Sequence, residues 1–113
     1  MIRYLKPLFT TEKTADKTDV LKRSFREGAG AFGYFLITIA SNEQDVFDII
    51  PIPLLKQRSF RHRDYDVIGL AESKEAAYTL VANIFAQYHA QYSSYDGIRK
   101  KLCEMLCEQE NET

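Results

Sequence analysis

The stretch AFGYFLITIA, at 31–40, constrains the fold of this chain more than any other segment. It is rich in aromatic and β-branched residues and too short for a buried helix, so it predicts a β-strand. Both alternating sets of side chains are apolar, with Phe32, Tyr34 and Leu36 in one set and Phe35, Ile37 and Ile39 in the other. Successive side chains of a strand point to opposite faces. We therefore expect a central strand that is covered on both faces.

Three other segments predict strands. DVFDIIPI at 45–52 follows a short turn and predicts an antiparallel hairpin with the first strand. YDVIGLA at 65–71 predicts another strand, in which Gly69 indicates a bulge or the close approach of another backbone. The first nine residues predict an edge strand that ends at Pro7, because proline cannot donate a hydrogen bond to its neighbour.

Helical periodicity follows the strand at 65–71. Apolar residues recur there at steps of three and four, namely Ala77, Leu80, Val81, Ile84, Phe85, Tyr88 and Tyr92. This pattern predicts an amphipathic helix over 73–92 with Ser73 as its N-cap. A second helix is expected from Ile98, and a shorter polar helix over 17–27 ends at Gly28.

The element order (β)-α-β-β-β-α-α predicts an α+β fold, with an antiparallel sheet of three to four strands and the C-terminal helices packed on one face. A length of 113 residues corresponds to a single domain, 1–113, of which the polar tail 107–113 is expected to fray. Because the strands look apolar on both sides, the helix over 17–27 or a second subunit must cover the other face. We therefore expect a homo-oligomer, in its simplest form a homodimer.

Charge and cysteine content define the expected class of protein. The formal net charge of −1 gives no overall preference for nucleic acid or an anionic membrane. No apolar run reaches the roughly 18 residues that span a bilayer, and the N-terminus does not resemble a secretory signal. The two cysteines, four positions apart, make no disulfide framework. We therefore expect a cytoplasmic protein with reduced thiols and no membrane partner.

Two short strings spell nucleotide-binding motifs without their structural context. GAGAFG at 28–33 has the G-x-G-x-x-G spacing, but it is expected to follow a helix and precede a strand, which reverses the order of a dinucleotide-binding loop. HRD at 62–64 spells the start of a kinase catalytic loop, yet Gly69 stands where that loop needs asparagine. The strand at 45–52, which comes after the glycine-rich string and its strand, also lacks the phosphate-binding lysine of a kinase, and no D-F-G follows HRD. We interpret the glycines as a helix stop, a turn and a small residue for packing within the strand.

A basic stretch is the most distinctive local charge feature. Its residues Arg58, Phe60, Arg61, His62 and Arg63 are the candidate ligand-binding residues. Arginine matches phosphate geometry and an aromatic ring can stack on a base, so an anionic ligand or RNA is one interpretation. The alternative is a solvated loop whose charge is partly cancelled by Asp64 and Asp66.

The other reactive side chains predict structural roles. Tyr88, Tyr92 and Tyr95 extend the apolar stripe of the long helix, as core or interface residues. Cys103 and Cys107 lie one helical turn apart, but a closed zinc site needs four ligands. No nucleophile–base pair can be assembled from sequence. We expect no catalytic residues, no metal and no cofactor.

The stretch YDVIGLAESKEAAYTLVANI, together with FGYFLITIA before it, resembles a pattern in small uncharacterised bacterial α+β proteins, over residues 28–92. The resemblance implies an α+β domain of a bacterial cytosolic protein and carries no activity or ligand. Our leading hypothesis is a non-enzymatic protein that acts through protein–protein contacts, including self-association. A module for RNA or a small phosphorylated ligand, using the loop 56–63, is the second hypothesis, and an enzyme of unknown type is the third.

Overall fold

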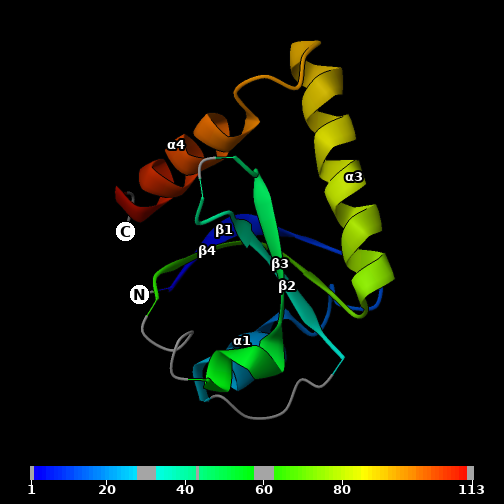
Figure 1. The fold of residues 1–113 in the computed structure, drawn as a ribbon, viewed down its shortest axis with the longest axis vertical. Helices are drawn as coiled ribbons and strands as arrows, with labels where there is room; N and C mark the ends of the chain where they lie inside the picture. The colour runs from blue at the N-terminus through cyan, green and yellow to red at the C-terminus, as the bar shows by residue number, and fades with distance from the viewer. Residues whose placement is uncertain (1, 28–32, 43, 58–62, 112–113) are drawn as a thin grey trace.

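The computed structural model describes residues 2–27, 33–42, 44–57 and 63–111 (Figure 1). The strands and α-helices follow one another in the expected order, and the fold is α+β. The elements are β1 (Ile2–Thr10), α1 (Thr18–Glu27), β2 (Phe35–Ile39), β3 (Phe47–Pro51), the 3-10 helix η1 (Ile52–Lys56), β4 (Tyr65–Ala71), α3 (Lys74–Tyr92) and α4 (Ile98–Asn111).

The four strands form one mixed sheet in the order β1-β4-β2-β3. β2 is antiparallel to both of its neighbours, as the hairpin predicted, but β1 is parallel to β4. The expectation of a wholly antiparallel sheet is therefore wrong for this pair. The reason is topological: β1 and β2 run in opposite directions, so a strand inserted between them must be parallel to one of them.

β1 lies at the sheet edge as predicted, but it continues past Pro7 to Thr10. Its pairing with β4 is interrupted between Tyr4 and Phe9, where four residues of β1 stand opposite Ile68 alone. Proline is tolerated there because a bulge needs no ladder hydrogen bond from its nitrogen.

Two glycines have different roles. Gly69 stands at an irregularity in the β4–β2 register, and a Cβ there would lie 2.8 Å from the carbonyl oxygen of Phe9. The predicted bulge and close backbone approach are both confirmed. Gly33 was expected inside a strand, but it forms a turn before β2 with φ of +85°. That left-handed conformation suits glycine. Gly28 and Gly30 lie outside the described residues.

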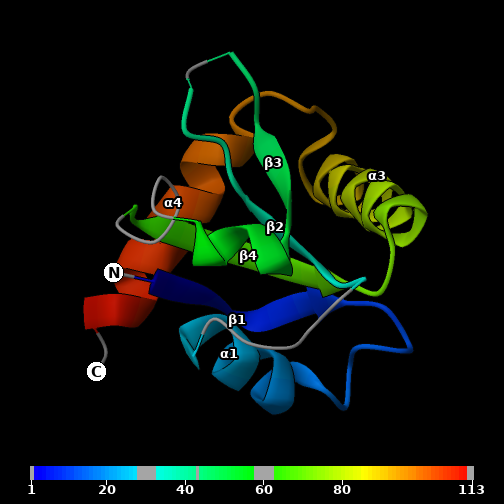
Figure 2. The same ribbon diagram turned by 60° about the horizontal axis from the view of Figure 1, so that its bottom comes forward.

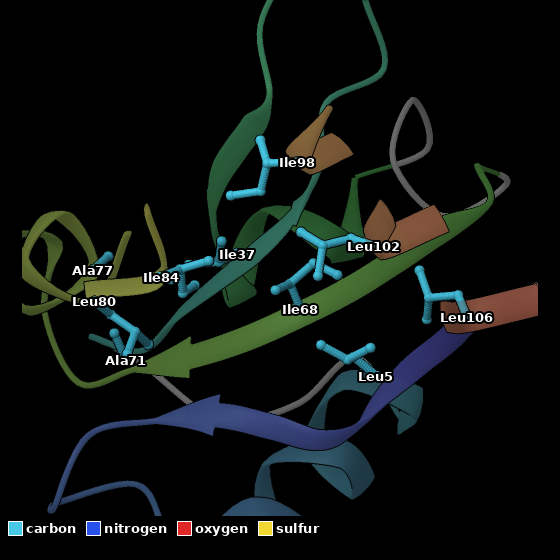
Figure 3. Close-up of a cluster of buried hydrophobic side chains, with 10 residues drawn as sticks. All are labelled: Leu5, Ile37, Ile68, Ala71, Ala77, Leu80, Ile84, Ile98, Leu102 and Leu106. Atoms are coloured by element: carbon cyan, nitrogen blue, oxygen red, sulfur yellow. The ribbon is translucent and has the colours of Figure 1, made fainter. Parts of the chain in front are cut away.

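The two C-terminal helices pack on one face of the sheet, as expected (Figures 1 and 2). Ser73 is the N-cap of α3, since its hydroxyl accepts a hydrogen bond from the Ala76 amide at 3.0 Å. Ten buried side chains from β1, β2, β4, α3 and α4 fill the space between sheet and helices (Figure 3): Leu5, Ile37, Ile68, Ala71, Ala77, Leu80, Ile84, Ile98, Leu102 and Leu106.

The opposite face of the sheet is covered by α1 and η1 (Figure 2). Leu21 of α1 is only 3% exposed and belongs to a second buried cluster, with Leu36, Ile50, Ile52, Tyr65, Val67 and Leu70. The central strand is therefore covered on both faces within one chain. An uncovered face no longer gives a reason to expect a second subunit.

A hydrogen-bonded corner joins the end of β1 to the end of β4. Thr14 is completely buried, and its hydroxyl donates to the Leu70 carbonyl at 3.1 Å while accepting from the Thr11 amide at 2.9 Å. The Thr11 hydroxyl donates to the Glu72 carboxylate. This hydrogen bond holds the pKa of Glu72 below its usual range.

The hydrogen bond from Thr11 to Glu72 should make a pH-dependent contribution to the free energy of unfolding. A carboxyl group whose pKa is lower in the folded state stabilises the fold above its unfolded pKa of about 4.3, and this stabilisation is lost as pH falls through the folded pKa. Thr11→Val, which removes the donor to Glu72, should therefore reduce the free energy of unfolding more at pH 7 than at pH 3. Urea unfolding at both pH values measures the difference. Equal losses would contradict the assigned role of this hydrogen bond.

Candidate functional site

Of the five predicted ligand-binding residues, Arg58, Phe60, Arg61 and His62 lie outside the described residues. Arg63 is exposed and lies just before β4, at the rim of a cavity of about 250 Å³ between the end of β2 and α4. The hypothesis of an anionic ligand or RNA at this loop stays a prediction.

This cavity, the β4 cavity, contains charges of both signs. Arg63 and Arg99 line it together with Asp48, Asp64 and Asp66. Arg99 donates to the carbonyl oxygens of the turn before β3, at 2.9 Å to Ala40 and 3.2 Å to Asp45, and also to Asn42. Asp66 accepts two hydrogen bonds from Arg3, at 2.7 and 3.0 Å. The residues of the cavity thus stabilise the turn and β1 by ion pairing and hydrogen bonding.

Cys103 of α4 is not an activated nucleophile. Burial raises the pKa of the half-buried Cys103 thiol, and the nearby charge of Asp66 raises it further. A raised pKa keeps the thiol protonated, whereas nucleophilic and metal-binding cysteines are thiolates. In the described part of the chain, no three His, Cys, Asp or Glu side chains are grouped closely enough to hold a metal ion.

The two thiols should differ in reactivity. Cys107 is exposed, and the Arg3 guanidinium lies 3.7 Å from its sulfur. With iodoacetamide at pH 8 we expect Cys107 to be alkylated several-fold faster than Cys103, because alkylation requires an accessible thiolate. Mass spectrometry of Cys107→Ser and Cys103→Ser, each retaining one thiol, measures the two rates. Equal rates would contradict the burial assigned to Cys103.

The backbone of β3 is paired on one side only. β3 lies at the sheet edge next to β2, and Ala40 and Ile52 donate to Val46 and Tyr34 in the same ladder, both at 3.0 Å. Antiparallel pairs alternate between hydrogen-bonded and non-hydrogen-bonded positions. The amides of positions 46, 48, 50 and 52 therefore face β2, whereas the N–H and C=O groups of Phe47 and Ile49 face outward. In the described residues these outward groups have no hydrogen-bond partner.

A groove runs beside this free edge. It has a volume of about 400 Å³, lies between β3 and the N-terminal half of α3, and is lined by Phe35, Phe47, Asp48, Ile49, Pro51, Lys74 and Tyr78. We call it the β3 groove. Tyr78 is 56% exposed, which is high for a large aromatic side chain. The groove thus places apolar surface next to unpaired backbone groups.

The other edge of the sheet is closed at Lys6 by the end of α4. At β1 the Lys6 amide donates to the Gln109 side chain at 2.9 Å, and the Gln109 amide group donates back to the Lys6 carbonyl at 2.6 Å. Pro7 follows and has no N–H to offer. The same contact holds the end of α4, which extends to Asn111 and so includes the first part of the segment 107–113, for which fraying was expected. An exposed edge strand can pair with a strand of another chain. The contrast between the two edges therefore identifies β3 as the candidate strand for such pairing.

A series of aromatic contacts leads from Phe47 toward the end of α3. Phe85 packs edge-on against Phe47, with ring centroids 5.5 Å apart, and against Tyr95 at 6.1 Å. Tyr95 also lies 4.7 Å from the His89 ring, and the Tyr88 hydroxyl donates to the Asp96 carbonyl at 2.6 Å. Tyr88 is half-buried, while Tyr92 and Tyr95 are exposed. The aromatic stripe passes from the core to the surface.

Sequence reasoning identified the strand at 45–52 but missed the groove, because its two walls come from distant segments. Pro51 was the available signal, since proline in a strand indicates an edge position. Among the described helices, none is long and apolar enough to cross a membrane. Comparison with known proteins finds no protein-family model, no curated protein and no solved structure that matches this chain.

Proposed function

We propose that this protein is a non-enzymatic interaction module that binds an extended polypeptide segment as an added strand along β3. The observation that carries the proposal is the unpaired outer edge of β3 beside the β3 groove, in a sheet whose other edge is closed at Lys6 and Pro7.

Strand addition uses both features of this edge. The outward N–H and C=O groups of Phe47 and Ile49 supply hydrogen bonds to the backbone of any extended segment. Alternate side chains of the added strand would enter the groove, where Tyr78 and the partly buried Phe47 favour apolar groups. The module would thus select segments with apolar residues at every second position.

A displayed library of random nonapeptides tests this proposal. We expect the selected peptides to carry alternating apolar residues and to slow hydrogen exchange at the amides of Phe47 and Ile49 by more than tenfold, because a bound strand pairs them. The amides of Asp48 and Ile50 are the internal control, since they already face β2. NMR of the isotope-labelled protein with one selected peptide measures the hydrogen-exchange rates of all four amides.

Two variants distinguish peptide binding in the β3 groove from nonspecific binding to exposed apolar side chains. Tyr78→Glu places a charge at an exposed position of the groove and should weaken peptide binding without unfolding the protein. Val20→Glu, at an equally exposed apolar position on the opposite side of the sheet, is the matched control and should leave binding unchanged. Peptides that bind equally to both variants, or leave the Phe47 and Ile49 amides unprotected, would overturn the proposal.

A further inference from the structure

Resting on the proposed function, we infer that the segment bound along β3 is β3 of a second copy of this chain. The two sheets would join across a two-fold axis into one continuous sheet. Three features carry this inference: the hydrogen-bonding register of β3, the apolar side chains it would insert into the opposing groove, and the opposite charges of Lys74 and Asp45.

The register follows from the outward groups of β3. Antiparallel pairing with full overlap places Ile49 opposite Ile49 of the second copy and Phe47 opposite Pro51. Each Ile49 amide then donates to the opposing Ile49 carbonyl, and each Phe47 amide donates to the opposing Pro51 carbonyl. The missing N–H of Pro51 removes one hydrogen bond at each end of the pair and leaves the central bonds intact.

The neighbouring symmetric register is disfavoured by charge. Shifting the strands so that Phe47 stands opposite Ile49 of the second copy would place Asp48 directly opposite Asp48. Like charges at directly opposite positions destabilise a strand pair. In the full-overlap register Asp48 instead stands opposite Ile50. The two-fold axis is therefore expected to pass through Ile49.

The inserted strand matches the groove. Phe47 and Ile49 point to the face of the sheet that carries α3, because both pack against the cluster under that helix. Their counterparts in the second copy would therefore point to the same face of the joined sheet. Phe47 of the second copy would lie opposite Pro51, at the end of the groove where Tyr78 is exposed. Each copy thus supplies both a groove and the side chains that enter it.

Opposite charges from the two copies would also meet at the end of the groove near Pro51. Lys74 lines the groove near Pro51, in the first turn of α3, where the helix dipole adds positive potential. Asp45 is exposed and precedes Phe47 by two residues, so in the second copy it would reach the Lys74 end of the groove. The symmetry makes this pair occur twice. Such pairs favour the correct partner over others.

Sedimentation equilibrium with charge-exchanged variants tests the inference. The wild type is expected to have twice the chain mass of 13.1 kDa. Lys74→Glu and Asp45→Lys should each raise the dimer dissociation constant by about tenfold, because both sites then oppose like charges. The double variant Lys74→Glu/Asp45→Lys should restore dimerisation, which also shows that the exchanged side chains are compatible with folding. A double variant no tighter than the single variants would overturn the charge pairing.

Hydrogen exchange identifies the surface and separates this inference from the proposed function. Protection of the Phe47 and Ile49 amides should rise with protein concentration, while that of Asp48 and Ile50 stays constant. A mass of one chain at about 1 mM, where even weak association is populated, would overturn the inference. So would a dimer in which the Phe47 and Ile49 amides exchange fast. If library peptides still protect these amides in either case, the proposed function stands with another partner. If they do not, both fail.

Discussion

Replacing Gly69 by alanine is expected to lower the free energy of unfolding by about 1–3 kcal/mol, the usual cost of overpacking a core. The added Cβ would lie 2.8 Å from the Phe9 carbonyl oxygen and 3.3 Å from Cδ2 of Leu80. Leu80 can adjust its rotamer, but the Phe9 carbonyl belongs to β1. The clash is therefore relieved only if β1 moves away from β4.

The sign of the stability change in Gly69→Ala shows whether this site is sterically hindered. At an unhindered site, a glycine-to-alanine change stabilises a protein by about 0.4–1 kcal/mol, because it reduces the entropy of the unfolded chain. Urea unfolding of Gly69→Ala measures the change, and Gly69→Val should cost more because it adds two further carbons at the same contact. Amides of β1 near Phe9 should also lose hydrogen-exchange protection. A more stable alanine variant would show that β1 does not approach β4 this closely.

Gly69 illustrates what local sequence can predict. A glycine inside an apolar strand has few explanations, and both the strand at 65–71 and the helix begun by Ser73 follow from patterns within a few residues. Sheet order does not, because pairing joins segments that are far apart in the chain. Nothing local to residues 2–10 indicates that β1 pairs with β4, or that the pair is parallel.

The candidate site shows the same limit. The segment DVFDIIPI after its turn predicts a strand, but whether that strand is central or at an edge depends on where β4 inserts. The closed edge at β1 depends on Gln109, more than 100 positions from Lys6. Charged residues that are clustered in the sequence are easily recognised, which is why the basic loop drew attention before the groove, whose charged residues Asp48 and Lys74 are far apart in the chain. Self-association was expected from an uncovered face, but α1 and η1 cover that face, so the dimer proposed above is argued from the edge of β3 instead.

The second large effect concerns the helix that covers the far face. Leu21→Ala is expected to reduce the free energy of unfolding by about 2–5 kcal/mol, as for other buried leucines. Leu21 is 3% exposed and packs over the sheet among Leu36, Val67 and Leu70. Its neighbour Val20, in contrast, is 60% exposed. Leu21 therefore anchors α1 to the sheet.

Val20→Ala is the matched control, one position away on the same helix. An exposed side chain contributes little to packing, so the change should alter stability by no more than about 0.5 kcal/mol. Equal losses for the two variants, measured by urea unfolding, would mean that α1 does not cover the sheet as described.

The Leu21→Ala and Val20→Ala variants also distinguish two possible surfaces for self-association. Loss of α1 packing would uncover Leu36 and Val67 on the far face, so an oligomer formed through that face should strengthen in Leu21→Ala. A dimer joined through β3 should instead weaken only to the extent that the fold itself is lost.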